Sequence, residues 1–329
     1  MLSPLIFALV TSANPAVEVE IAGAGGFKIS AVVEMPESAT KPCPAVILMP
    51  GSGPTNRDGN QPPAFVTDLL KDVAAEIRKE GFATVRFDKR PVASNRSQWP
   101  VSEPTKLRSF FSFDNHVLDA VEVFKFVQKY DGIDGKKVIV LGHSEGGMIA
   151  TEMTRFVNPA GLILMGTPAR PMADILHIQI KQSLEANKVP DELSSKMLDD
   201  VDRATKAVLA DQPVPKDLNP QIAVLFPEIN LDYWKGMLGF DAPKLLVKYA
   251  GPVLVLNGER DVQISATLDA PVLMNALKER KNPHQKIVII PGASHNFKKP
   301  KDDKDPGFTG PVVPETVKSI RDWLKAEIR

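Results

Sequence analysis

Short runs of apolar and β-branched residues alternate along this chain with longer segments of helical periodicity, and this alternation constrains the fold most strongly. The strand-like runs lie at 17–21, 27–34, 45–49, 83–87, 137–141, 161–165, 253–257 and 286–290. The helical patterns lie at about 64–80 and 114–130, from about 146, at 267–279 and from about 314. Such alternation implies right-handed crossovers and a mostly parallel sheet with helices on both faces. The predicted fold class is α/β.

Two details of this pattern give local predictions. The first two strand-like runs flank the turn Gly23–Gly26 and predict a hairpin. The helix predicted at 64–80 has Val66, Leu70, Val73 and Ile77 on one face, with Gly81 as its C-terminal stop.

The segment 168–248 interrupts the alternation and contains no strand-like run. Apolar residues recur in it at helical spacing, at Leu193, Met197, Val201, Ala204 and Val208. It follows a strand, so it should lie over the sheet edge where open α/β sheets bind ligands. We therefore expect a core of residues 17–167 and 249–329 with a helical cap subdomain at 168–248.

The composition excludes several classes of function. The 329 residues include 40 basic and 40 acidic side chains, so no bulk charge favours nucleic acid or anionic lipid. The one cysteine, Cys43, allows neither an intramolecular disulfide nor a cysteine-based zinc site. No stretch of the sequence approaches the roughly 20 apolar residues of a membrane span.

The first 16 residues are a possible signal or N-terminal extension. Residues 4–10 are apolar and precede Thr-Ser-Ala at 11–13, as in a secretory signal, but no Lys or Arg precedes them. Export to the periplasm or medium and a cytoplasmic location both remain open.

The segment Gly142-His143-Ser144-Glu145-Gly146-Gly147 connects a strand-like run directly to a helical pattern. A nucleophile on so sharp a turn has strained backbone angles, and glycines two residues before and after it remove clashing Cβ atoms. The following helix directs its free N–H groups at the reacting oxygen. Ser144 is the predicted nucleophile.

A serine nucleophile needs a general base, and His295 is the best placed of the five histidines. It follows the strand at 286–290 after a short loop, which brings it to the sheet edge where Ser144 lies. His143 adjoins the serine and should point away, His116 and His177 lie in helices, and His284 precedes a strand.

The base in turn needs an acid to orient it. Asp261 follows the strand at 253–257 and would accept the His295 Nδ1–H, with Glu259 as a local competitor. The chain order Ser, Asp, His matches the order known for α/β hydrolases.

An oxyanion formed at Ser144 needs two N–H donors. We expect one from the backbone of Glu145 and the other from the small-residue loop after the strand at 45–49, with Ser52 first and Gly53 second. That loop does not match a nucleotide-binding motif.

Together these segments resemble the α/β-hydrolase superfamily over residues 25–329. The supporting motifs are PGSGPTNRDGN at 50–60, RFDKR at 86–90, GHSEGG at 142–147, NGERDVQI at 257–264 and GASHNF at 292–297. They are similar to the bacterial esterase and serine-aminopeptidase-like branch, near the dienelactone hydrolases and acetyl esterases. The resemblance implies hydrolysis of a small-molecule ester, thioester or amide without metal or organic cofactor.

The chain departs from this pattern at two places. Pro50-Gly51 stands where many relatives have His-Gly, and Pro91-Val-Ala-Ser-Asn replaces a glycine-rich turn. For the neighbouring Arg57, Asp58, Asp88 and Arg90, ion pairs that fix loops are expected rather than a direct role.

The sequence favours a two-step carboxylic ester hydrolase that acts on a small or medium uncharged acyl group. A peptidase, amidase or thioesterase with the same triad is the alternative, and a catalytically silent binding protein is a more distant one. A peptidase would need a carboxylate for the substrate amine. The cap offers four candidates, Glu185, Glu192, Glu228 and Asp232.

Overall fold

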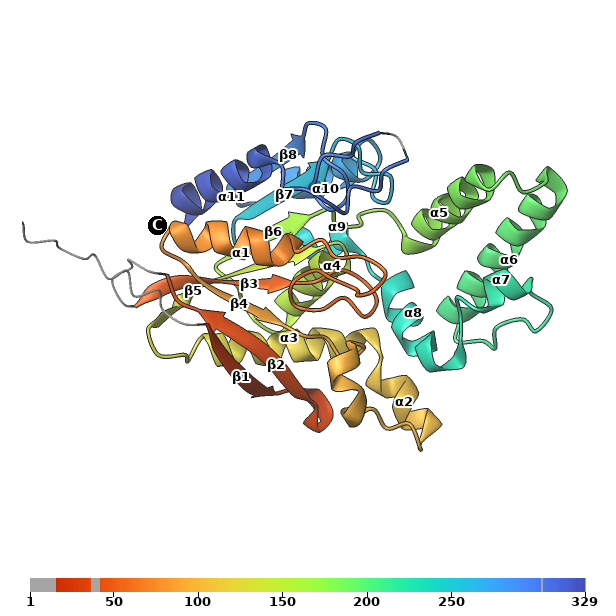
Figure 1. Ribbon diagram of the computed structural model, residues 1–329, viewed down its shortest axis with the longest axis horizontal. Coiled ribbons are helices and arrows are strands. Elements are labelled where there is room, and N and C mark those ends of the chain that lie inside the picture. Colours follow the sequence, from red (N-terminus) through yellow and green to blue (C-terminus); the bar gives the residue numbers. More distant parts are fainter. Residues whose placement is uncertain (1–15, 37–41, 303, 329) are drawn as a thin grey trace, which may run out of the picture.

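An eight-stranded sheet forms the centre of the molecule (Figure 1). The computed structural model describes residues 16–36, 42–302 and 304–328, so the predicted N-terminal signal lies outside the described residues. The strands are β1 (Val17–Ala22), β2 (Lys28–Glu34), β3 (Cys43–Met49), β4 (Ala83–Phe87), β5 (Ile133–His143), β6 (Gly161–Met165), β7 (Val253–Gly258) and β8 (Gln285–Ile290). Their spatial order is β1-β2-β4-β3-β5-β6-β7-β8.

The strand pairing confirms the predicted sheet. β1 and β2 form the expected antiparallel hairpin, β2 pairs antiparallel with β4, and all other neighbours are parallel. The inner strands are buried on both faces, as their continuous apolar runs predict.

Helices cover both faces of the sheet (Figure 1). α1 (Leu69–Lys79) and α11 (Pro314–Glu327) pack on one face. α3 (Phe113–Val127), α4 (Glu145–Glu152) and α10 (Asp269–Lys278) pack on the other, and α2 (Pro104–Phe110) precedes α3. Short 3-10 turns lie at Ala24–Gly26, Ala93–Gln98, Met153–Arg155 and Glu228–Asn230.

The predicted helix at 64–80 is shorter than expected. α1 begins only at Leu69, and Val66, placed on its buried face by the pattern, is 54% exposed. Before the helix, Gln61 and Phe65 form an isolated antiparallel bridge, and Asp68 has a left-handed backbone conformation. The helix can therefore begin only after Asp68. α2, a helix of seven residues, was not predicted from the sequence.

The segment after β6 is helical and extends beyond the carboxyl ends of the strands (Figure 1). Its helices are α5 (Met172–Ala186), α6 (Asp191–Leu209), α7 (Pro220–Ala223), α8 (Leu231–Leu238) and α9 (Ala242–Leu246). On α6 the predicted apolar positions are buried except Leu193, which lies in the first turn and is exposed.

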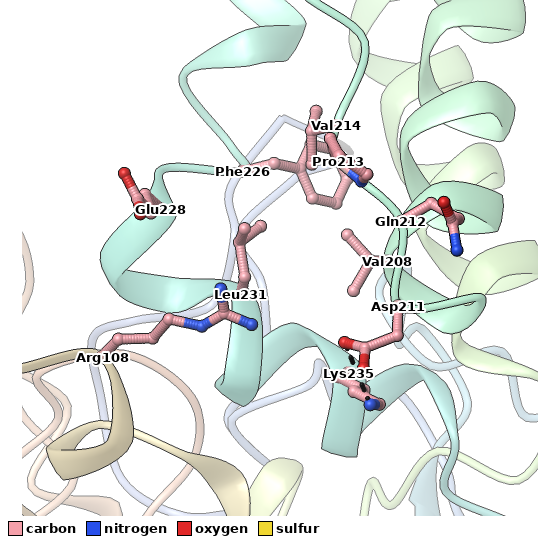
Figure 2. A pocket seen from close by; sticks show the side chains of 10 residues that line it. All are labelled: Arg108, Val208, Asp211, Gln212, Pro213, Val214, Phe226, Glu228, Leu231 and Lys235. Carbon is pink, nitrogen blue, oxygen red and sulfur yellow. Dashed lines mark ion pairs between the residues drawn. The ribbon is translucent and has the colours of Figure 1, made fainter. Parts of the chain in front are cut away.

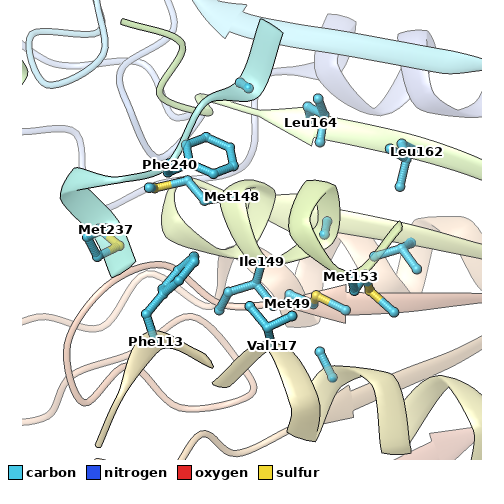
Figure 3. Close-up of a cluster of buried hydrophobic side chains, with 14 of the residues drawn as sticks. Met49, Phe113, Val117, Met148, Ile149, Met153, Leu162, Leu164, Met237 and Phe240 are labelled. Carbon is cyan, nitrogen blue, oxygen red and sulfur yellow. The ribbon is translucent and has the colours of Figure 1, made fainter. Parts of the chain in front are cut away.

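The hydrophobic core continues from the sheet into α8 and the residues after it. Met237 and Phe240 lie beside Phe113 and Met148 in one buried cluster (Figure 3). A Cβ atom at Gly236 would lie 2.5 Å from the Cβ of Phe113, so this glycine allows α8 to approach α3 closely. Among the helices of the described residues, none has the length and apolar character of a bilayer-spanning segment.

The close approach at Gly236 gives a stability prediction. Alanine is the better helix former, yet Gly236→Ala should lower the free energy of unfolding by about 1–3 kcal/mol because it overpacks the contact with Phe113. Urea denaturation measures the change. Gly239→Ala is the matched control, because its nearest neighbouring atom would lie at 3.2 Å, and it should have the smaller effect. Equal effects would contradict the packing argument.

Candidate functional site

Ser144 occupies a sharp turn between β5 and α4. Its backbone has φ 55° and ψ −121°, a conformation that costs a non-glycine residue of order 1–3 kcal/mol. The Ser144 N–H donates to the carbonyl of Met165 on the neighbouring strand at 2.8 Å. Cβ atoms at Gly142 and Gly146 would collide with the carbonyl oxygens of Gly146 and Met49, so both positions require glycine.

Asp261 and His295 meet at the same edge of the sheet. The His295 Nδ1–H donates to Oδ2 of Asp261 at 2.8 Å, and both residues are buried. The other carboxylate oxygen of Asp261 accepts the backbone N–H groups of Gln263 and Ile264 at 2.9 and 2.8 Å. These bonds fix the carboxylate in the orientation that the imidazole needs.

Glu259, the competing acid, lies elsewhere. Its carboxylate accepts the backbone N–H of Gly292 at 2.8 Å and is exposed. The geometry therefore pairs His295 with Asp261 and gives Glu259 a place in the neighbouring loop.

A cavity of about 140 Å³ brings Ser144 and His295 together with the loop after β3. Around the two residues it is lined by Gly51, Ser52, His143 and Asn296. Its remaining walls are Thr55, Gly59, Gln61, Phe65, Gln263 and Phe308. Among these lining residues none is acidic and none comes from the segment 168–248. Phe65 and Phe308, whose rings stack at 4.9 Å, form an apolar part of the wall.

The loop after β3 is held rigidly by its own side chains. The carbonyl of Ser52 accepts bonds from Thr55 Oγ1 at 2.7 Å and Gln61 Nε2 at 2.9 Å. Within the described part of the chain, the N–H groups of Ser52 and Gly53 donate no hydrogen bond. Glu145 begins α4, where backbone N–H groups lack helical partners. These groups are free to receive an oxyanion.

His143 does not point away from the site, contrary to the expectation from its place beside Ser144. Its ring centroid lies 4.8 Å from that of His295, and its Nε2–H donates to the carbonyl of His295 at 2.9 Å. Burial lowers the pKa of His143 to about 3, and the nearby His295 contributes to this shift. A neutral imidazole therefore holds the backbone of the loop that carries His295.

A second cluster surrounds the buried carboxylate of Glu145. Lys89 Nζ lies 3.0 Å from Oε1, Tyr233 Oη donates to Oε2 at 2.5 Å, and His116 Nδ1 lies 3.6 Å from Oε1. Burial alone would raise the pKa of Glu145, but Lys89, His116 and Tyr233 lower it to about 2. Burial and the charge on Glu145 raise the pKa of Tyr233.

This cluster was not predicted from the sequence. Lys89 lies inside the RFDKR motif and could have been singled out, but Tyr233 contacts a residue 88 positions away and carries no local signal.

The charged residues of the flanking motifs form ion pairs that fix loops, as expected. Asp88 accepts the backbone N–H of Arg57 at 2.8 Å and its Nε–H at 3.1 Å. Arg86 pairs with Asp58, and Arg90 pairs with Asp119 at 2.6 Å.

A larger cavity of about 430 Å³ lies between α2 and the helices after β6 (Figure 2). Three of its charged residues are in ion pairs, Lys235 with Asp211 at 3.1 Å and Arg108 with Asp232 at 2.6 Å. Of the predicted site residues only Glu228, a candidate for an amine site, lines it, and it shares no lining residue with the cavity at Ser144.

Comparisons with solved structures identify the fold. The chain is similar to Est1E from Butyrivibrio proteoclasticus (TM-score 0.57, 15% identity, 94% of this chain and 98% of that one). It is also similar to an esterase of Pyrococcus furiosus (TM-score 0.58, 15% identity, 96% and 92%). A dienelactone hydrolase from Anabaena variabilis matches with a TM-score of 0.52 (16% identity, 96% and 100%). These likenesses show the α/β-hydrolase fold and confirm the fold expected from the sequence.

Sequence comparison gives the family. Esterase EstD from Thermotoga maritima is 27% identical over 257 residues, which are 77% of this chain and 54% of that protein. The chain thus spans about half the length of this relative. The model of the family described as "Serine aminopeptidase, S33" matches residues 67–299. Because this match covers most of the chain, the protein belongs to the serine aminopeptidase S33 family of α/β hydrolases.

Proposed function

We propose that this protein is a serine-dependent carboxylic ester hydrolase with Ser144 as nucleophile, His295 as general base and Asp261 as the orienting acid. The observation that carries the proposal is the 2.8 Å bond from His295 to Asp261 beside the cavity that also contains Ser144. The strained turn at Ser144 supports the choice of nucleophile, because such a turn exposes the hydroxyl at the sheet edge.

The proposed reaction is a two-step acyl transfer. His295 takes the proton of Ser144 as its oxygen attacks the ester carbonyl, and Asp261 stabilises the imidazolium that results. The imidazolium then protonates the departing alcohol, which leaves an acyl-enzyme that a water molecule hydrolyses by the same route. The N–H groups of Ser52 and Glu145, with Gly53 as a further candidate, would hold the oxyanion in both steps.

The cavity at Ser144 supports a small, uncharged acyl group. It measures about 140 Å³ and combines the amides of Gln61, Gln263 and Asn296 with the rings of Phe65 and Phe308. The Thermotoga maritima relative is named as an esterase, which supports ester hydrolysis.

A peptidase using the same triad is the second candidate, since the family carries the name of an aminopeptidase. The acidic residues considered for an amine site give it little support. Asp232 is paired with Arg108, and Glu185 lies 3.9 Å from Lys181. Glu192 is exposed on α6, and Glu228 borders the separate cavity between α2 and α8. A substrate ammonium group at Ser144 would meet only neutral side chains and His295.

We assign the segment 168–248 the role of a cap over the carboxyl edge of the sheet. Two ion pairs support this role, Arg170 with Asp269 on α10 at 2.9 Å and Arg108 with Asp232 on α8 at 2.6 Å. Gln179 on α5 also donates to the carbonyl of Gln263, which borders the cavity at Ser144.

Loss of the triad should abolish activity. Ser144→Ala and His295→Ala should each lower kcat by about four orders of magnitude or more while the protein still folds, because the two residues act as a unit. Steady-state hydrolysis of p-nitrophenyl acetate measures the loss, and a fluorophosphonate probe should label wild-type Ser144.

Asp261→Asn should impair turnover more than the matched Glu259→Gln. Labelling of another serine, with Ser144→Ala still active, would refute the proposal.

The leaving group separates the esterase from the peptidase. An amine must be protonated as it departs and needs close positioning, whereas a phenoxide leaves readily. Short-chain p-nitrophenyl esters should therefore have kcat/KM values at least about 100-fold above those of matched aminoacyl p-nitroanilides, or roughly 2.7 kcal/mol. Comparable or faster turnover of the anilides would decide in favour of the peptidase.

The neutral state of His143 gives a pH prediction. Because its pKa falls to about 3 on folding, only the unfolded chain binds a proton there between about pH 6.5 and 3. This contribution to stability is complete above pH 6.5 and is lost as the pH falls. His143→Gln keeps an N–H donor but does not titrate. Between pH 7 and 4.5 its free energy of unfolding should therefore fall by about 2 kcal/mol less than that of the wild type.

Urea unfolding at the two pH values measures this difference. The control is Gly239→Ala, which changes no titratable group, and it should follow the wild-type dependence. Parallel curves for wild type and His143→Gln would show that His143 does not contribute to acid sensitivity.

A further inference from the structure

The ion pair between Lys89 and Glu145 is buried, and the proposed triad does not use it. The side chain of Lys89 is 3% exposed and that of Glu145 is 1% exposed. Removing two charges from water costs several kcal/mol per ion, and well-packed apolar side chains often serve stability as well. Stability alone is therefore a weak explanation for this pair.

Lys89 also contacts the loop that we expect to bind the oxyanion. Its Nζ donates to the carbonyl oxygen of Gly51 at 2.5 Å. That carbonyl belongs to the same peptide group as the N–H of Ser52. Because a peptide group is planar and trans, fixing the direction of its oxygen also fixes the direction of its N–H.

The charge on Lys89 has a further effect on this peptide. A hydrogen bond from a cation is stronger than one from a neutral donor, and hydrogen bonds in a chain polarise one another. An ammonium group on the carbonyl of Gly51 therefore makes the Ser52 N–H a better donor to a negatively charged oxygen.

Both expected oxyanion donors are connected to this pair. Glu145, which holds the ammonium of Lys89, carries the other donor on its own backbone. Tyr233 from α8 occupies the second carboxylate oxygen of Glu145 at 2.5 Å and so restricts the carboxylate to one orientation. A single buried network thus connects the loop after β3, the start of α4 and the cap.

We propose that Lys89 is a positioning residue of the oxyanion hole, which orients and polarises the Gly51–Ser52 peptide while Glu145 and Tyr233 hold its ammonium group in place. This inference rests on the proposed serine hydrolase function. Lys89 acts on the reacting oxygen only through the peptide.

The test is Lys89→Met in the full chain, assayed with p-nitrophenyl acetate and with phenylboronic acid, which forms a tetrahedral adduct on a nucleophilic serine. Removing a direct oxyanion donor costs about 100-fold to 1,000-fold in kcat, so an indirect effect of about 10-fold to 100-fold is expected. Acylation and deacylation use the same donors, so both should slow together and KM should change by less than about twofold. Affinity for the boronic acid should fall in parallel with kcat.

Lys89→Met leaves the carboxylate of Glu145 buried without its cation and could disturb folding. Lys89→Met/Glu145→Gln removes both charges and keeps the volume of both side chains. It should show the same fall in kcat and in boronic acid affinity. Tyr233→Phe keeps the ion pair and should show a smaller fall.

Arg280→Met is the matched control. Arg280 is also a buried cation that donates to backbone carbonyls, those of Tyr249 and Gly251, but it lies between α10 and β8 and contacts the residues that precede β7. The variant should lose stability and keep wild-type kcat and boronic acid affinity.

Three results would overturn the inference. The first is a folded double variant with wild-type kcat and boronic acid affinity. The second is a rise in KM at unchanged kcat, which would make Lys89 a loop anchor only. The third is a failure of the fluorophosphonate to label Ser144 of the wild-type enzyme. This result would refute the proposed function itself, and it is obtained before any variant is made.

Discussion

The left-handed backbone of Ser144 is the constraint on which the surrounding structure depends. The chain must change from strand to helix within one residue, and contacts with β5 itself and with its two neighbouring strands stabilise this strained turn. Met165 of β6 accepts the Ser144 N–H, Met49 of β3 lies against Gly146, and β5 enters the turn through Gly142. The central strands must therefore end in register at this point, which also explains why the other polar groups of the site collect there.

Two histidines lie side by side in this site with opposite electrostatic roles. The proposed mechanism requires His295 to gain and lose a proton, and Asp261 supports the protonated form. Among the described residues His143 bonds to a carbonyl and to no carboxylate; it is buried and stays neutral. A charge on His143 would repel the imidazolium of His295, so its low pKa is consistent with the chemistry that we propose.

The sequence predicts those parts of the structure that depend on local signals. Strand periodicity, the glycines around Ser144, and residues that follow strands led to the sheet and to the pairing of Asp261 with His295. Signals that depend on tertiary contacts were missed. The late start of α1 depends on the bridge from Gln61 to Phe65, and Val66 looked buried only because the helix was assumed to continue. The direction of the His143 side chain depends on a carbonyl 152 residues away, which no local pattern reveals.

The hydrogen bond from Tyr233 to Glu145 has a consequence for how this protein could diversify. Segments inserted at the carboxyl edge of a sheet are tolerant of change, because the sheet folds around its own core. Here the insertion supplies one of the groups that satisfy a buried carboxylate next to the nucleophile. A chimeric protein with a foreign segment in place of 168–248 would leave that carboxylate oxygen without its donor. The outer helices can vary freely. A segment that replaces 168–248 during evolution or design must nevertheless place a hydroxyl or similar donor beside the same carboxylate oxygen.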